Sequence, residues 1–295
     1  MKKIFYLLFT AISITAFTQE APEKPKILYG ICTRDSLMKE PFDKWYKTGY
    51  NNYIPNAGVL ASLKKQSFEN ITIKVFFGTW CGDSKREVPR FLKLLSSFSF
   101  PEKYLQLIAL GGSDSLYKQS PGHEEAGLGI FRVPAIIVYR NGKEINRINE
   151  FPVFSLEKDL LQIITNQPYS PNYPFFSTLL NWLNDETFTD ENINIRGMAE
   201  QLRTRVSDEH VLNNLGYLLL KQGSKKEALQ IFRINYTLYP ESSNTASSLG
   251  EGYYENNDYR KAVSFLERSL ELNKDPQLVK QILAILYKAK EKDKG

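Results

Sequence analysis

Residues 73–91 read IKVFFGTWCGDSKREVPRF and carry a single cysteine, Cys81. The run that ends at Phe77 is apolar and rich in β-favouring residues, which indicates a buried strand. After a short turn, apolar residues return at helical spacing, at Val88, Phe91, Leu92 and Leu95. The sequence therefore predicts that Cys81 lies where a strand ends and a helix begins.

This predicted position favours the ionised form of Cys81. The first N–H groups of a helix have no partners inside the helix, so they stabilise a thiolate over a thiol. The carboxylate of Asp83 opposes this effect, and Lys85 and Arg86 partly offset Asp83. We therefore expect a reactive thiol. The alternative is an inert cysteine in the core, for which residues 80–83 (WCGD) are a poor sequence.

The segments on both sides of this turn predict an α/β domain over residues 68–167. The predicted strands are 71–77, 104–110, 133–139 and 144–149, and the predicted helices are 83–98, 123–128 and 156–165. Asn141-Gly142 separates the last two strands, and this dipeptide between apolar runs is typical of a β-hairpin.

The residues around Cys81 resemble the active-site segment of the thioredoxin family, and the order of elements is that of the thioredoxin fold. Trp80-Cys81-x-x-Ser84-Lys85-x-Glu87-x-Pro89 is similar to exported thioredoxin-like proteins of the cytochrome-maturation and disulfide-reduction type. The resemblance implies a central mixed sheet flanked by helices, with Trp80 and Cys81 in the active site. It also implies that Glu87 modulates thiol ionisation; the alternative is a solvent-facing helix charge.

A second part of the family pattern lies at Val133-Pro134-Ala135. Thioredoxin-fold proteins carry a cis-proline in this setting, opposite the active cysteine. The resemblance therefore implies a cis Val133–Pro134 bond and a role for Pro134 in shaping peptide docking. The alternative is a proline that starts an edge strand.

Two departures from the family pattern bear on the chemistry. Ser84 replaces the second cysteine of the motif, so it can donate a hydrogen bond to the thiolate but cannot release a mixed disulfide. Val75 stands where many thioredoxins bury an acid that assists proton transfer. Turnover then needs an external thiol reductant or Cys32, the only other cysteine. The sequence leaves open whether Cys32 pairs with Cys81 or resolves its mixed disulfides.

The C-terminal half predicts a linker with helices over 168–207 and an all-α domain of helical hairpins over 208–292. The expected helices of that domain are 208–222, 225–238, 242–256, 259–273 and 276–288. Leu215-Gly216 recurs as Leu249-Gly250, 34 residues later. This period resembles the tetratricopeptide repeat family, which implies a face that binds protein or peptide partners. The alternative is an array that packs only on its own α/β domain.

The N-terminus has the pattern of a bacterial export signal. Lys2 and Lys3 precede an apolar core at 4–17, and Ala16-Phe17-Thr18 is a small-residue cleavage pattern. The core is shorter than the roughly 20 residues that a spanning helix needs, and an uncleaved anchor is the alternative. We therefore expect residues 1–18 to be removed near Thr18, and the mature chain to be periplasmic or extracellular without a membrane span.

Residues 19–67 are expected to form an N-terminal extension that packs on the α/β domain. The pattern predicts a short strand at 27–31, helices at 36–47 and 58–65, and a turn at 49–56.

Composition and charge exclude other classes of function. The formal net charge is +5, part of it in the leader, and no basic stripe with interleaved aromatics suggests a nucleic-acid partner. The two histidines, His123 and His210, and the two cysteines lack metal-ligand spacing, so we expect no metal and no cofactor.

Two hypotheses of function follow from the sequence. The first is an exported thioredoxin-like protein with monothiol exchange through Cys81 and a repeat domain that selects the client. The second is a redox-inactive adaptor or chaperone-like module on the same scaffold.

Overall fold

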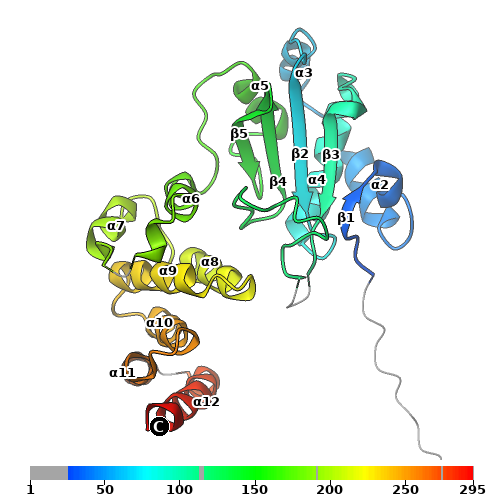
Figure 1. The fold of residues 1–295 in the computed structure, drawn as a ribbon. Coiled ribbons are helices and arrows are strands. Elements are labelled where there is room, and N and C mark those ends of the chain that lie inside the picture. Colours follow the sequence, from blue (N-terminus) through cyan, green and yellow to red (C-terminus); the bar gives the residue numbers. More distant parts are fainter. Residues whose placement is uncertain (1–25, 113–115, 191, 274, 295) are drawn as a thin grey trace, which may run out of the picture.

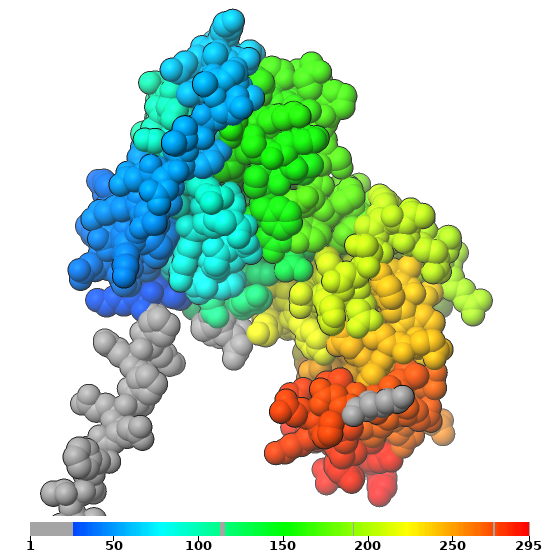
Figure 2. All heavy atoms as spheres, turned by 180° about the vertical axis from the view of Figure 1, so that it is seen from behind, coloured from blue at the N-terminus to red at the C-terminus, as the bar shows by residue number. Residues whose placement is uncertain are grey.

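The computed structural model describes residues 26–112, 116–190, 192–273 and 275–294. An α/β part built on one sheet precedes an all-helical part, and the two form adjacent lobes (Figures 1 and 2). The expected leader, residues 1–18, lies outside the described residues. In the described part of the chain, no helix is long and apolar enough to cross a membrane.

The α/β part contains a five-stranded mixed sheet; the sequence predicted four of these strands in the α/β domain and a short strand in the extension. Its strands are β1 (Gly30–Cys32), β2 (Ile71–Phe77), β3 (Leu105–Ala109), β4 (Ala135–Arg140) and β5 (Lys143–Asn149). The order across the sheet is β1-β3-β2-β4-β5, in which β2 and β3 are parallel and the other pairs antiparallel. Together with its flanking helices, this sheet is a thioredoxin-like fold.

Helices cover one face of the sheet, and the loop before β4 covers the other. Val75, Leu107 and Ile136 share a register and face α4 (Gly82–Ser97) and α5 (Leu156–Ile164) in the larger core cluster. Their neighbours in the strands point to the opposite face, because side chains alternate along a strand. There, Phe76, Ile108 and Ile137 pack with Ile130 and Val133 of the loop before β4.

The N-terminal extension contributes an edge strand and three helices. They are α1 (Arg34–Leu37), α2 (Asp43–Asn52) and α3 (Ala57–Leu63). The single helix expected at 36–47 is wrong, because Pro41 lacks an N–H group and clashes with the preceding turn of a helix, so the chain begins a new helix at Asp43. The expected turn at 49–56 is also shorter, since α2 continues to Asn52.

The short helix expected at 123–128 is wrong: these residues form a series of turns. Gly127 and Gly129 adopt φ of +70° and +60°, which a right-handed helix does not allow. In addition, the carboxylates of Glu124 and Glu125 bind the hydroxyl of Ser120, which fixes the segment as a compact loop.

The helical part follows the predicted pattern closely. It begins with α6 (Phe176–Asn184) and α7 (Ile195–Leu202), and continues with α8 (Glu209–Lys221), α9 (Lys225–Leu238), α10 (Ser243–Glu255), α11 (Tyr259–Leu272) and α12 (Pro276–Asp293). The small residues are explained by close helix crossings. A Cβ atom at Gly216 would lie 2.3 Å from the ring of Phe232, and one at Gly250 would lie 2.7 Å from Leu266.

The two parts share an apolar contact next to the sheet. The ring of Phe131, in the loop before β4, stacks on Phe176 of α6 with centroids 3.9 Å apart and planes at 23°. Phe131 belongs to the core cluster of the helical part, and the partly buried Tyr117 packs against that cluster. The loop before β4 is therefore packed between the sheet and the helices, while α10 to α12 extend away (Figure 1).

Candidate functional site

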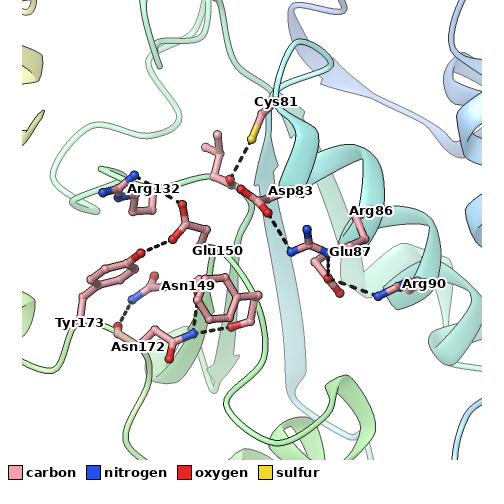
Figure 3. A network of polar contacts seen from close by, with 12 residues as sticks. Cys81, Asp83, Arg86, Glu87, Arg90, Arg132, Asn149, Glu150, Asn172 and Tyr173 are labelled. Carbon is pink, nitrogen blue, oxygen red and sulfur yellow. Dashed lines mark hydrogen bonds and ion pairs between the residues drawn. The ribbon is translucent and has the colours of Figure 1, made fainter. Parts of the chain in front are cut away.

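Cys81 lies at the predicted junction. It is the N-cap residue of α4, with extended backbone angles (φ −89°, ψ 129°), and its side chain is half-buried. Its Sγ donates a hydrogen bond to the carbonyl oxygen of Val133 at 3.2 Å (Figure 3). The first turn of α4 begins directly after the thiol, where the unpaired N–H groups stabilise negative charge.

Pro134 lies beside this thiol. The Val133–Pro134 peptide bond is cis, which confirms the conformation expected from the sequence. Because Cys81 is bonded to the carbonyl of Val133, the structure brings the two family positions, Cys81 and Pro134, together at one edge of the sheet.

Ser84 supports the turn between β2 and α4 from within the core. Its side chain is fully buried, and its Oγ accepts a hydrogen bond from the backbone N–H of Gly78 at 3.1 Å. A buried N–H without a partner is costly, and this serine provides the acceptor for the Gly78 N–H directly after β2. The cysteine that the family pattern has here would be a weaker acceptor.

Trp80 forms one wall of the site. Its Nε1–H donates to the carbonyl of Leu110 at 3.0 Å, and its ring lies 5.4 Å from that of Tyr117. The indole lies so close to the backbone that a Cβ atom on Gly78 or Gly112 would come within 2.5 Å of it. The site therefore requires glycine at both positions.

Charged side chains line the exposed edge of α4. Asp83 is paired with Arg86 at 2.8 Å, and the buried Glu87 accepts from Arg86 and, at 3.5 Å, from Arg90 (Figure 3). The alternative of a solvent-facing charge at Glu87 is thus wrong. Its carboxylate holds Arg86, and the hydrogen bond to Glu87 raises the pKa of Arg86, so the guanidinium stays charged beside Asp83.

The structure does not bring Cys32 to Cys81. Both thiols are free. Cys32 is aligned with Leu107 and packs in the α4–α5 cluster, whereas Cys81 packs in the cluster on the opposite face of the sheet. Burial raises the pKa of Cys32 to about 12, so at neutral pH this thiol is protonated and a weak nucleophile.

A polar network on the other side of the thiol was not visible in the sequence. Arg132 contacts Glu150 at 3.5 Å, its guanidinium lies 5.4 Å from the ring centroid of Tyr173, and the Tyr173 hydroxyl donates to Glu150 (Figure 3). The network links the loop before β4, the end of β5 and the segment before α6. A second basic residue, Lys118, is buried in the same region with its Nζ 2.6 Å from the carbonyl of Phe131. These residues lie in loops, where no periodic pattern points to them.

Within the described ranges, no group of three or more His, Cys, Asp and Glu side chains could hold a metal ion. His123 lies 3.3 Å from Glu125, and His210 lies beside Asn244, so the two histidines occupy separate places.

Comparison with known proteins identifies one tetratricopeptide repeat in the helical part. Residues 245–280 match the family model of the tetratricopeptide repeat, a segment that includes most of α10, all of α11 and the start of α12. No curated protein and no solved structure matched the chain. Repeats of this family commonly contact other proteins, so the helical part is consistent with protein–protein interaction.

Proposed function

We propose that this protein is an exported thioredoxin-fold protein that carries out thiol–disulfide exchange through Cys81 alone, and that its repeat domain recruits a protein partner. One observation carries the redox half of the proposal. The half-buried thiol of Cys81 lies at the first turn of α4 and is bonded to the carbonyl that precedes the cis-proline. This arrangement places the sulfur beside the cis-proline and next to the unpaired N–H groups of a helix end.

The exchange step balances with one protein thiol. The Cys81 thiolate attacks a sulfur of a client disulfide, a bond forms between Cys81 and the client, and the client's own S–S bond breaks. The leaving sulfur takes up a proton. Ser84 has no sulfur to continue the reaction, and Cys32 lies on the other face of the sheet with its pKa raised to about 12. An external thiol therefore attacks the mixed disulfide and restores Cys81.

The mixed disulfide should accumulate when no external thiol is present. The test mixes the protein with a peptide whose cysteine carries a nitrothiobenzoate group. Release of the chromophore is followed by absorbance, and the adduct is identified by intact mass. We expect one peptide per chain on Cys81. Cys81→Ser should abolish the adduct, and the matched control Cys32→Ser should leave its yield unchanged.

A second variant tests the role given to position 84. Ser84→Cys should release the peptide instead of accumulating the adduct, because the introduced thiol displaces the peptide and forms a disulfide with Cys81; further cycles then require an added reducing thiol. Ser84→Ala, which lacks a thiol, should still accumulate the adduct. A wild-type protein that forms no adduct while free cysteine reacts under the same conditions contradicts the proposal.

The second candidate is a redox-inactive adaptor. It is favoured by Ser84, which is fully buried and satisfies the Gly78 N–H, so the scaffold is stable without a second thiol. This candidate predicts that Cys81→Ser binds the same partners as the wild type and has no other defect.

Export is the part of the proposal that rests on sequence alone. Its support is the pattern of residues 1–18, with Lys2 and Lys3 before an apolar core. Fractionation of the producing cell and N-terminal sequencing of the mature chain test it. A mature protein in the cytoplasm that begins at Met1 contradicts it.

A further inference from the structure

We propose that Lys118 stabilises the Cys81 thiolate and donates the proton that the departing client thiol takes up. This inference rests on the exchange proposed for Cys81 and assigns the acid of that reaction.

Lys118 and Cys81 are anchored to the same short segment of chain. The Nζ of Lys118 donates to the carbonyl of Phe131 at 2.6 Å, and the Sγ of Cys81 donates to the carbonyl of Val133 at 3.2 Å. Consecutive Cα atoms are about 3.8 Å apart, so the Cα atoms of these two acceptors are separated by less than about 8 Å. The ammonium and the thiol therefore flank one short stretch next to Pro134.

The backbone holds Lys118 in place at some cost. Its φ is +56°, in the left-handed region that non-glycine residues seldom adopt. Its N–H donates to the carbonyl of Gly111, and the N–H of Gly111 donates to the carbonyl of Gln119, both at 2.9 Å. These two bonds close the loop after β3 and direct the lysine inward.

The surroundings of Lys118 provide a neutral acceptor and no ion-pair partner. The side chain is 7% exposed, its hydrogen bond goes to a carbonyl, and no acid forms an ion pair with it in the parts of the chain that the structure describes. Lysine is rarely buried without a pairing acid. An apolar residue of similar length would fill this space without the cost of a buried charge, which favours a functional reason for lysine.

The charges that face Lys118 come from four elements. Burial lowers its pKa to about 8, and Arg132 from the loop before β4 and Lys221 at the end of α8 act in the same direction. Cys81 at the start of α4 and Glu150 after β5 raise it. At pH 7 the group therefore carries a proton, and it gives that proton up more readily than an exposed lysine does.

The proton balance closes over one cycle. When the client S–S bond breaks, negative charge develops on the leaving sulfur, and the Lys118 ammonium gives its proton to that sulfur and becomes an amine. When an external thiol approaches, the amine removes its proton, and the resulting thiolate attacks the mixed disulfide. Cys81 leaves as a thiolate next to the regenerated ammonium.

The experiment compares three variants in a Cys32→Ser background, so that Cys81 is the reacting thiol. The rate of alkylation by iodoacetamide is measured against pH for Lys118→Met, Lys118→Arg and the exposed control Lys143→Met. In Lys118→Met we expect the midpoint of the profile to move to higher pH and the rate at pH 7 to fall about tenfold, because one nearby positive charge is lost. Lys118→Arg and Lys143→Met should keep the parent midpoint.

Two disulfides with different leaving groups distinguish the effect of the Lys118 charge from its role as a proton donor. Lys118→Arg retains the charge but cannot release a proton near neutral pH. It should slow exchange with a peptide disulfide that expels an aliphatic thiol, and leave exchange with the nitrothiobenzoate disulfide unchanged, because nitrothiobenzoate leaves as an anion. A merely structural lysine would affect both disulfides equally.

The outcomes distinguish this inference from the function on which it rests. Identical alkylation profiles for Lys118→Met and Lys143→Met overturn the role of Lys118 and leave exchange at Cys81 intact. If the profile of Lys118→Met is shifted but the parent protein forms no mixed disulfide, the exchange reaction is overturned and the stabilisation of the thiolate by Lys118 is retained. Far-UV circular dichroism and urea unfolding of each variant verify that the compared proteins are folded.

Discussion

Gly78 and Gly112 leave the space that the indole of Trp80 occupies, and this indole in turn supports the turn that carries Cys81. At each glycine an added Cβ atom would meet the ring at 2.5 Å. By contrast, Gly82 has open space around its Cβ direction, although it directly follows the thiol. The requirement for glycine is therefore local to the residues that contact Trp80.

This difference predicts opposite effects of two similar substitutions. Gly78→Ala should lower the free energy of unfolding by about 1–3 kcal/mol, because the ring must move within a packed site. The matched control Gly82→Ala should leave stability unchanged or raise it by up to about 1 kcal/mol, since alanine favours the helix. Urea unfolding of both variants measures the difference. Equal stabilities would show that the indole moves without cost.

Single residues were predictable from the sequence where a motif fixed their place. Cys81 at the N-terminus of a helix and the cis bond before Pro134 are both found as expected. Lys118 and Arg132 were not predictable, because their positions depend on hydrogen bonds between loop residues, such as the pair Gly111 and Gln119. Such bonds leave no periodic pattern in a chain.

At the scale of elements, pairs of helices carry the stability of the C-terminal part, and a half-buried acid, Glu251, lies between two of them. The hydroxyl of Tyr217 on α8 donates to Glu251 on α10 at 2.9 Å. Burial raises the pKa of Glu251 above its ordinary value of 4.5, although the hydrogen bond from Tyr217 opposes this effect. The folded protein thus binds the Glu251 proton more tightly than the unfolded chain does.

The sign of this shift predicts a pH dependence. Because the folded state binds more protons, Glu251 lowers stability progressively as pH rises above 4.5 through its folded pKa. Glu251→Gln keeps an acceptor for Tyr217 without the charge, so it should raise stability at pH 7 by on the order of 1 kcal/mol and have little effect below pH 4. The exposed control Glu291→Gln should leave stability unchanged both at pH 7 and below pH 4. Thermal unfolding from pH 4 to 8 tests this, and a benefit that is equal at all pH values would contradict it.

Elements with a strong period were well predicted, and those set by long-range contacts were not. Helices α8 to α11 lie within one residue of their expected bounds, because the 34-residue period comes from close crossings such as that of Gly216 with Phe232. The last helix, α12, ends at Asp293 and not at the expected residue 288. The strand near residue 30 was expected, but its antiparallel pairing with β3 was not. A strand of three residues has too little pattern to specify its neighbour in a sheet.

At the scale of the whole molecule, the two lobes are joined through the loop before β4. The stack of Phe131 on Phe176, at 3.9 Å between centroids, lies at the centre of this contact. The Arg132–Glu150–Tyr173 network closes the same region near the connecting segment. The sequence left open whether the array binds a partner or packs on its own domain. In the structure, α6 of the preceding linker and Lys221 of α8 contact the α/β part.

Loss of this stack should uncouple the lobes. Phe176→Ala removes a buried ring and should weaken the contact by about 3–5 kcal/mol. We expect separate unfolding transitions by calorimetry and faster proteolysis between residues 166 and 174. The control Tyr287→Ala, whose ring is 65% exposed on α12, should behave as the wild type. A single transition and unchanged proteolysis in Phe176→Ala would show that the lobes are held by other contacts.

The ring of Tyr117 has a consequence for how the two lobes communicate. Its centroid lies 5.4 Å from that of Trp80, next to the thiol, and the Nζ of Lys221 from α8 lies 4.8 Å from the Tyr117 centroid. A movement of α8 therefore changes the surroundings of Trp80. Thermodynamic reciprocity then applies: if an occupant of the repeats shifts the equilibrium between the free thiol and the mixed disulfide of Cys81, formation of that disulfide alters the affinity for the occupant by the same factor. The redox state of the Cys81 sulfur would then be measurable as a change in the dissociation constant of a partner bound to the helical part.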